Sequence, residues 1–431
     1  MNVKTVLEDC LEGKALGRSE ARALSSVEGE ELAALLSSAS ELRDRHKGKT
    51  VTFSPKLFIP LTNLCRDFCG YCTFRKAPEE TGAKTMTLDE VLRVVRRGKE
   101  LGCAEVLFSL GDKPERIYPE MRNFLKQLGL RRTLDYLHNA CELVLEESGL
   151  LPHSNPGLMG KRDLERLKKV NVSLGLMLEN ISERLLLHSG PHADAPDKRP
   201  MVRLKTIEEA GRLRIPFTTG ILIGIGENWG ERMDSLFAIR ELNQRYGHIQ
   251  EVIIQNFRAK PGIPMRDCPE PTVDEMLKTI ALARLILGGE MNIQAPPNLT
   301  PESYPLYLHA GINDWGGVSP VTPDYINPEA PWPELTVLHR KTAEAGFVLK
   351  PRLAVYPEVI FQGEKFISPA LFRHVERLCG EDGLLKNELS RRLVTSERPE
   401  GLGVQGLTNT ATSREHDEKF KGSRVSGVSA G

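Results

Sequence analysis

The chain has 431 residues, of which 40% are hydrophobic, and its 58 lysine and arginine residues balance its 58 aspartate and glutamate residues. This length and hydrophobic content are sufficient for one large α/β domain or two smaller domains. Because the formal net charge is zero, the composition gives no electrostatic reason to expect a nucleic acid or an anionic membrane as a partner.

The first residues, MNVKTVLEDCLEGKALGRSEARAL, are charged and amphipathic, and they lack the apolar core and cleavage site of a secretory signal. No run of about 18 apolar residues occurs, so we expect no transmembrane helix. A cytoplasmic, reducing location follows as the expectation, in which cysteines are thiols or metal ligands rather than disulfides. Five scattered cysteines are expected to be small buried residues: Cys10, Cys103, Cys141, Cys268 and Cys379.

Residues 1–48 carry apolar residues at helical spacing and predict a helical N-terminal lead-in. From residue 49 to 330, short apolar segments alternate with amphipathic helical segments. The expected strands are 51–62, 104–111, 150–157, 171–180, 216–227, 251–257, 291–299 and 315–320. The expected helices between them are 87–102, 133–149, 161–170, 199–214, 231–247 and 272–287.

Continuous apolar strands that alternate with helices indicate a buried parallel sheet. About eight such strands predict an α/β fold of the (β/α)₈ TIM-like barrel type, in which active sites lie at the C-terminal ends of the strands. Polar residues occur at these expected ends: Asp112, Asn155, Glu179, Asn180, Glu227, Asn256 and Asn298.

After the barrel, residues 331–395 return to helix and strand patterns and predict a C-terminal extension packed against it. Residues 396–431 contain few large apolar side chains and much glycine, serine and threonine. Such a segment cannot bury enough surface to offset its chain entropy, so we expect a disordered tail.

The most informative segment follows the first expected strand and reads Cys65-Arg-Asp-Phe-Cys69-Gly-Tyr-Cys72. Three thiolates on one short loop can bind three irons of a [4Fe–4S] cluster, and the fourth iron then has no protein ligand. An open coordination position is a feature of reactive sites rather than structural ones. The alternative is a zinc site completed by a histidine, but no nearby C-x2-C or H-x3-5-H pattern supplies the fourth ligand.

This C-x3-C-x2-C spacing, with the aromatic Tyr71 before the last cysteine, resembles the signature of the radical S-adenosylmethionine (SAM) superfamily. The resemblance implies a radical SAM barrel in which Cys65, Cys69 and Cys72 bind a [4Fe–4S] cluster and SAM occupies the open iron. In that superfamily one electron from the cluster cleaves SAM to a 5′-deoxyadenosyl radical, which abstracts hydrogen from the substrate. A low-potential electron donor is therefore a further implied partner.

Other segments resemble the SAM-binding pattern of the superfamily. Gly111-Asp-Lys-Pro-Glu115 resembles a Gly-Gly-Glu-like turn for the methionine amino group, with Asp112 in place of the second glycine. The segment 220–227, GILIGIGE, resembles the G-x-I-x-G-x-x-E segment near the adenine. The implied SAM-binding residues are Tyr71, Gly111, Asp112, Glu179, Arg203, Gly224, Gln255 and Asn256. For Arg203, an ordinary position on a surface helix is the alternative.

Segments farther from the cysteines resemble one family within this superfamily, the first subunit of the 7,8-didemethyl-8-hydroxy-5-deazariboflavin synthases. The resemblance is carried by FIPLTNLCRDFCGYCTFRK, SLGDKPE, LPHSNPG, IQNFRAKPGIPM and DWGGVSPVTPDYINPEAPWP, and it runs from about residue 15 to 385. It implies a carbon–nitrogen (ammonia) lyase whose substrate is a hydroxybenzyl-ribityliminouracil adduct made by a companion subunit. Radical ring closure and loss of ammonia then give the chromophore of coenzyme F420.

Two alternatives come from the same branch: the adduct-forming partner subunit and the futalosine cyclase of menaquinone biosynthesis. The GGVSPVTP segment favours the ring-closing subunit over both. A third alternative, from another class, is a zinc-stabilised binding protein without catalysis.

A ribityl chain and a uracil edge need several neutral donors and acceptors. The candidates on expected loops are His153, Ser154, Asn155, Asn298, Ser319 and Thr322. A proton acceptor is needed during ring closure and ammonia loss, and Asp112, His188 and Asp314 are the candidates. Trp315 either stacks on a substrate ring or belongs to the core.

Overall fold

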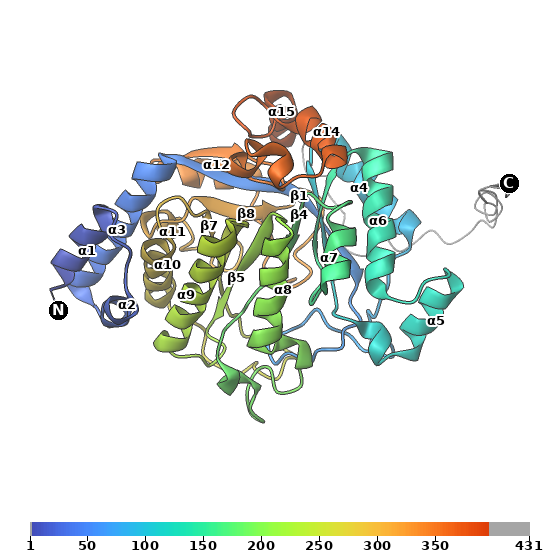
Figure 1. The fold of residues 1–431 in the computed structure, drawn as a ribbon, viewed down its shortest axis with the longest axis horizontal. Coiled ribbons are helices and arrows are strands. Elements are labelled where there is room, and N and C mark those ends of the chain that lie inside the picture. Colours follow the sequence, from blue (N-terminus) through green and yellow to red (C-terminus); the bar gives the residue numbers. More distant parts are fainter. Residues whose placement is uncertain (1, 396–431) are drawn as a thin grey trace, which may run out of the picture. The chain divides into compact units, whose positions relative to one another are not determined.

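The computed structural model describes residues 2–395, in which eight parallel strands form a barrel surrounded by helices (Figure 1). Neighbouring strands follow one another in chain order, and β1 pairs with both β8 and β2, which closes the cylinder. The strands are β1 (Thr50–Thr62), β2 (Glu105–Leu110), β3 (Leu151–Asn155), β4 (Ser173–Gly175), β5 (Phe217–Ile223), β6 (Ile249–Asn256), β7 (Ile293–Gln294) and β8 (Asp314–Val318). The predicted (β/α)₈ fold is confirmed.

Helices cover the outside of the barrel, and several begin with reciprocal caps. The helices of the barrel region are α4 (Leu88–Glu100), α5 (Pro119–Gln127), α6 (Thr133–Ser148), α7 (Lys161–Leu167), α8 (Pro200–Arg212), α9 (Trp229–Tyr246), α10 (Val273–Leu287) and α11 (Leu306–His309), with 3₁₀ turns η1 (Pro114–Arg116), η2 (Glu183–Leu186) and η3 (Pro196–Lys198). At α4, the Thr87 hydroxyl accepts from the Glu90 backbone N–H and the Glu90 carboxylate accepts from the Thr87 N–H. Such capping boxes fix where a helix begins.

The lead-in consists of α1 (Val3–Leu11), α2 (Arg18–Leu24) and α3 (Gly29–Lys47). Helix α3 packs against α10, and α2 packs against α9. The buried guanidinium of Arg43 donates to the backbone carbonyls of Leu308 and Ile312, at 3.0 and 2.5 Å. These hydrogen bonds attach the N-terminal lead-in to the barrel at the C-terminal end of α11.

Alternate residues of β1 face opposite sides of the barrel wall, as the period of a strand requires. Leu57, Ile59 and Leu61 are fully buried, and Leu57 packs so closely on Gly98 of α4 that a Cβ there would lie 2.3 Å from its Cδ1. Lys56 and Phe58 therefore point the other way, into the lumen. Polar residues on this inner face make the lumen hydrophilic.

The C-terminal extension contains α12 (Leu335–Glu344), β9 (Val348–Pro351), α13 (Pro357–Ile360), the 3₁₀ turn η4 (Gly363–Lys365), α14 (Pro369–Leu378) and α15 (Asn387–Thr395). Strand β9 pairs in parallel with the first residues of β1, from Thr50 to Phe53. In Figure 1, α12, α14 and α15 lie at the top of the view, beside the end of the barrel at which the strands begin.

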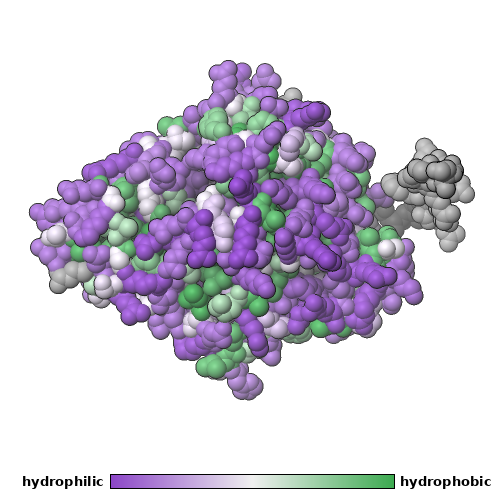
Figure 2. Space-filling view, in the orientation of Figure 1, coloured by the Kyte–Doolittle hydropathy of each residue, from purple (hydrophilic) through white to green (hydrophobic). Residues whose placement is uncertain are grey.

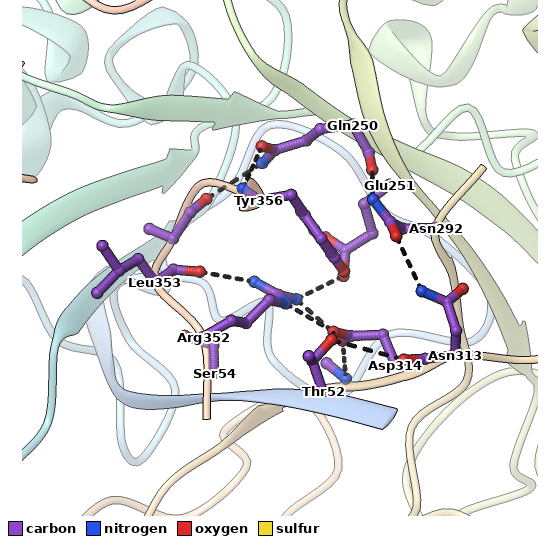
Figure 3. Close-up of polar contacts among 12 residues, drawn as sticks. Thr52, Ser54, Gln250, Glu251, Asn292, Asn313, Asp314, Arg352, Leu353 and Tyr356 are labelled. Atoms are coloured by element: carbon purple, nitrogen blue, oxygen red, sulfur yellow. Dashed lines mark hydrogen bonds and ion pairs between the residues drawn. The ribbon is translucent and has the colours of Figure 1, made fainter. Parts of the chain in front are cut away.

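The segment after β9 closes this end of the lumen through a buried ion network, the floor network of Arg352, Asp314, Glu251 and Tyr356 (Figure 3). The Arg352 guanidinium donates to both carboxylate oxygens of Asp314, at 2.6 and 2.9 Å, and to Glu251 Oε1 at 2.9 Å. The Tyr356 hydroxyl also donates to Glu251 Oε1, at 2.9 Å. Buried charges are stable only when they are paired in this way.

None of the helices within residues 2–395 is long and apolar enough to cross a membrane. In the view of Figure 2, hydrophilic residues cover most of the surface, and hydrophobic residues gather only in limited patches. Residues 396–431, for which disorder was predicted, lie outside the described part of the chain.

Removal of the Arg352 cation from the floor network should strongly lower the stability of the fold. Arg352→Met leaves the buried carboxylates of Asp314 and Glu251 without their cation, and breaking a buried pair from one side costs about 3–5 kcal/mol. Arg340→Met is the matched control, because Arg340 forms only an exposed i,i+4 pair with Glu344, and such pairs contribute about 0.3–0.5 kcal/mol. Thermal unfolding should show a clear loss of stability for the first variant alone. Equal melting temperatures would contradict the assigned role.

Candidate active site

The cysteine loop follows β1 and places three thiols on one wall of a cavity of about 250 Å³ at the C-terminal end of the barrel. We call this cavity the cysteine pocket; its lining includes Cys65, Cys69 and Cys72, together with the ends of β2 and β6. All three cysteines are free. The backbone N–H groups of Asp67 and Asp112 point at Cys65 Sγ, at 3.4 and 3.2 Å. Burial raises the pKa of Cys65, and it raises that of Cys69 to about 12.

Gly111, at the end of β2, allows the cysteine loop to lie against the barrel. A Cβ at this position would lie 2.0 Å from the Leu64 carbonyl oxygen and 2.6 Å from Cys65 Cβ. Its backbone N–H donates to the Thr62 carbonyl at 2.9 Å. Only glycine fits between these atoms, so the position of Cys65 depends on residue 111.

The Asp112 side chain lines the pocket and is almost completely buried. Its Oδ2 accepts from the Leu158 N–H at 2.9 Å, whereas Oδ1 has no hydrogen-bond donor. Lys113 Nζ lies 3.0 Å from Oδ1 as an ion pair but not in hydrogen-bonding geometry. Burial raises the pKa of Asp112 to about 6. A buried acceptor without a donor fits a ligand that brings an N–H group.

Glu179 and Arg203 lie on another wall of the same pocket. Glu179 has φ +64°, which is unusual for a residue with a side chain. Its carboxylate pairs with Lys198. Burial opposes ionisation of Glu179, but Lys198 and Arg203 outweigh it and hold its pKa below the usual range. Arg203 is buried and donates to the Met177 carbonyl at 2.7 Å, so the alternative of a surface position is excluded.

Tyr71, Gln255 and Asn256 also line the pocket. The Tyr71 hydroxyl lies 3.0 Å from His192 Nε2, and Asn256 Oδ1 is buried without a donor. Gly224 is not among the lining residues. It stands in the turn after β5 with φ +88°, and its N–H donates to the Glu227 carboxylate at 2.9 Å.

Of the three candidate proton acceptors, Asp112 alone lies in the cysteine pocket. His188 is exposed on the loop after η2 and is not part of the lining. Asp314 begins β8, at the opposite end of the barrel, where its charge is matched by Arg352. Trp315 is fully buried and donates to Thr342 of α12 at 3.1 Å, so it packs outside the barrel wall as a core residue.

A second cavity of about 160 Å³, the lumen chamber, lies deeper inside the barrel and shares part of its lining with the cysteine pocket. The shared residues are Ser109, Asn155, Met177, Gln255, Ile326 and Asn327. The polar and charged residues that belong to the lumen chamber alone are Lys56, Glu105, His153, Thr218, Glu251, Gln294, Asp324 and Arg352. The two cavities therefore adjoin one another, and the inner one is strongly polar.

Most of these lumen residues were not predicted as site residues from the sequence. They lie within strands, whereas the predicted site residues were taken from the strand ends and the loops that follow them. The available signal was polar residues at alternate positions of otherwise apolar strands, such as Ser54 and Lys56 in β1. Among the predicted substrate-binding residues, His153 and Asn155 line the chamber. The others bond within the protein: Ser154 to Asn171, Asn298 to Asp324, and Ser319 to Thr322.

Comparison with known proteins places this site in a family. The family model of the radical SAM superfamily matches residues 59–239. A 7,8-didemethyl-8-hydroxy-5-deazariboflavin synthase of Methanopyrus kandleri is 51% identical over 336 residues, which are 78% of this chain and 100% of that protein. FO synthases of Streptomyces avermitilis and Mycobacterium tuberculosis are 47% and 46% identical over 88% of this chain, but over only 45% and 46% of their own lengths. The chain thus spans about half the length of these FO synthases.

Solved structures with a similar fold include methylornithine synthase, with a TM-score of 0.64 and 20% identity over 80% of this chain and 97% of that one. HydG, a maturase of the [FeFe]-hydrogenase, has a TM-score of 0.68 and 16% identity over 91% of this chain and 92% of that one. At such identities the likeness concerns the fold alone. The match along the full length of the M. kandleri protein shows more: this chain belongs to the 7,8-didemethyl-8-hydroxy-5-deazariboflavin synthase family of radical SAM enzymes.

Proposed function

We propose that this protein is the ring-closing synthase subunit that forms 7,8-didemethyl-8-hydroxy-5-deazariboflavin, the chromophore of coenzyme F420, with loss of ammonia. The proposal rests first on the 51% identity of this chain to a 7,8-didemethyl-8-hydroxy-5-deazariboflavin synthase over the whole length of that protein. The polar lumen chamber beneath three free cysteines supports it, because an adduct with ribityl and uracil groups needs such a surface.

The cysteine pocket fits the two cofactors of this chemistry. Cys65, Cys69 and Cys72 are the residues to hold the [4Fe–4S] cluster. When bound, the cluster and SAM supply a one-electron cleavage that yields a hydrogen-abstracting radical. The buried Oδ1 of Asp112, which pairs with Lys113 but accepts no hydrogen bond from residues 2–395, suits the amino group of SAM, in agreement with its place in the Gly-Gly-Glu-like turn.

The remaining SAM contacts are proposed for other residues that line the cysteine pocket. Glu179, kept ionised by Lys198, suits the ribose hydroxyls, and Arg203 suits the methionine carboxylate. Gln255 and Asn256 suit the adenine edge, since Asn256 Oδ1 is a buried acceptor without a donor. Asp112 is thereby assigned to cofactor binding, and neither His188 nor Asp314 is placed to replace it in the pocket as a proton acceptor.

Two partners belong to the proposal. We assign formation of the hydroxybenzyl-ribityliminouracil adduct to a companion synthase subunit, as the resemblance of this chain to the ring-closing subunit implies. A low-potential donor must supply the electron that reduces the cluster.

The proposed function predicts which substrates suffice. Anaerobic, reduced protein with SAM should convert the preformed adduct into fluorescent deazaflavin and ammonia. The same protein with tyrosine and 5-amino-6-ribitylaminouracil should give none until the companion enzyme is added. Deazaflavin from the tyrosine mixture without a companion would contradict the division of labour, and no product from the adduct would refute the function itself.

The cluster assignment predicts a selective loss of iron. Cys69→Ala should abolish bound iron and sulfide and all cleavage of SAM, because Cys69 lines the cysteine pocket. Cys379→Ala is the control, because Cys379 follows α14 in the C-terminal extension and donates to the Gly380 carbonyl. Iron and sulfide analysis of anaerobically purified protein measures the difference. About one zinc per chain and no sulfide in the unaltered protein would instead support a zinc-stabilised protein.

Substitution of Gly111 should cause the same loss of iron although all three cysteines are kept. Gly111→Ala should displace the loop that carries Cys65, since the new Cβ would overlap the Leu64 carbonyl at 2.0 Å. Gly160→Ala is the control, because its nearest neighbour would be 3.6 Å away and Gly160 has φ −82°. Iron content and visible absorption should fall for the first variant and remain for the second. A full cluster in Gly111→Ala would show that the loop does not need this contact.

A further inference from the structure

The lumen chamber has a chemistry of its own that the cofactors do not use. Its volume is about 160 Å³, and a single water needs only about 10–15 Å³ on such a measure, so a ring-sized organic group fits. It adjoins the cysteine pocket, with which it shares wall residues such as Ser109 and Asn155. A group bound there would lie directly beneath the reacting cofactor.

Two adjacent glycines of β8 make the polar wall of the chamber possible. A Cβ at Gly317 would lie 1.2 Å from Lys56 Cε, so the lysine side chain runs directly across this glycine. A Cβ at Gly316, whose φ is +72°, would lie 1.9 Å from Gln294 Nε2. The DWGGVSP segment therefore clears room for a lysine and a glutamine inside the barrel.

Lys56 stands beside a buried carboxylate. Lys56 and Glu105 are register partners on β1 and β2, and Lys56 Nζ lies 3.3 Å from Glu105 Oε1. Glu105 is only 2% exposed, and its other oxygen accepts from Ser54. Burial raises the pKa of Glu105, but Lys56 and other nearby groups more than offset this and keep it below the usual range. An ammonium has three donors and each carboxylate oxygen accepts more than one hydrogen bond, so both groups retain capacity for a ligand.

A flat apolar surface adjoins this pair. Phe58 and Trp332 stack with ring centroids 5.0 Å apart, and Lys56 Nζ lies 5.5 Å from the Phe58 ring. Both aromatic residues belong to the chamber lining. Aromatic faces bind planar rings well. The chamber thus combines a ring-binding surface with an adjacent donor and acceptor.

We propose that the lumen chamber binds the pyrimidinedione end of the substrate, and that Lys56 is a positioning residue that donates to a ring carbonyl while Glu105 accepts from the neighbouring ring N–H. This inference rests on the proposed function and extends it to the substrate subsite. A carbonyl next to an N–H is the edge that a uracil ring presents, and the Lys56–Glu105 pair offers the complementary donor and acceptor. The hydroxybenzyl end of the adduct then extends toward the cysteine pocket.

The test uses anaerobic, cluster-loaded protein with SAM, and it measures both turnover of the adduct and calorimetric binding of 5-amino-6-ribitylaminouracil. Lys56→Met should weaken binding of the aminouracil and raise KM for the adduct by about tenfold or more, the loss typical of a hydrogen bond from a charged donor. Gly317→Ala should act in the same direction, because it displaces Lys56 without changing any charge. Iron content should stay unchanged in both variants. Lys350→Met is the matched control, since Lys350 on β9 is half exposed and 3.8 Å from Asp382.

A charge-balanced double variant distinguishes the loss of a ligand contact from a loss of stability. If Lys56→Met is unstable because Glu105 is left unpaired, Lys56→Met with Glu105→Gln should recover the melting temperature but not the binding of the aminouracil. Unchanged binding and KM in Lys56→Met and Gly317→Ala, with deazaflavin formed normally, would overturn the inference and leave the proposed function intact. Absence of deazaflavin from the unaltered protein, together with Lys56-dependent binding of the aminouracil, would refute the function and keep the subsite.

Discussion

The structure of the barrel interior depends on the buried ion network of Arg352 with Asp314 and Glu251. Both carboxylates stand on strands, whereas the guanidinium comes from the C-terminal extension. Because an unpaired buried carboxylate is costly, the strands and the extension stabilise one another. The network (Figure 3) lies at the end of the barrel where the strands begin, and the lumen chamber lies between it and the adjoining cysteine pocket.

Close approaches of other atoms to glycine shape the two cavities. Gly111 lets the cysteine loop approach β2 to distances that no other residue permits, and Gly317 leaves space for Lys56 inside the wall. Glycine is used at both positions for what its missing Cβ allows and not for its flexibility. Substitutions there change no charged or hydrogen-bonding side chain, so they test the geometry of the site separately from its side-chain chemistry.

The sequence was sufficient to predict the barrel and the cysteine loop, because apolar strands alternate with helices and the thiols are adjacent in the chain. It could not place residues whose role depends on distant partners. Asp314 was a candidate proton acceptor until the structure paired it with Arg352, which is 38 residues away in the chain. His188 was a candidate because of its residue type, but its loop leaves it exposed. The lumen residues Lys56 and Glu105 were not predicted, because candidates were taken from the loops after the strands, although alternation of polar residues within β1 indicated an inward polar face.

The inferred place of the substrate is the lumen chamber, next to the cysteine pocket that suits the cofactors. The most direct measurement is transfer of deuterium from an adduct labelled at its carbon-bound positions into 5′-deoxyadenosine, followed by mass spectrometry in a single turnover. Labelled 5′-deoxyadenosine should form together with deazaflavin. Deazaflavin formed with only unlabelled 5′-deoxyadenosine would contradict this position of the substrate, since hydrogen would then come from another group.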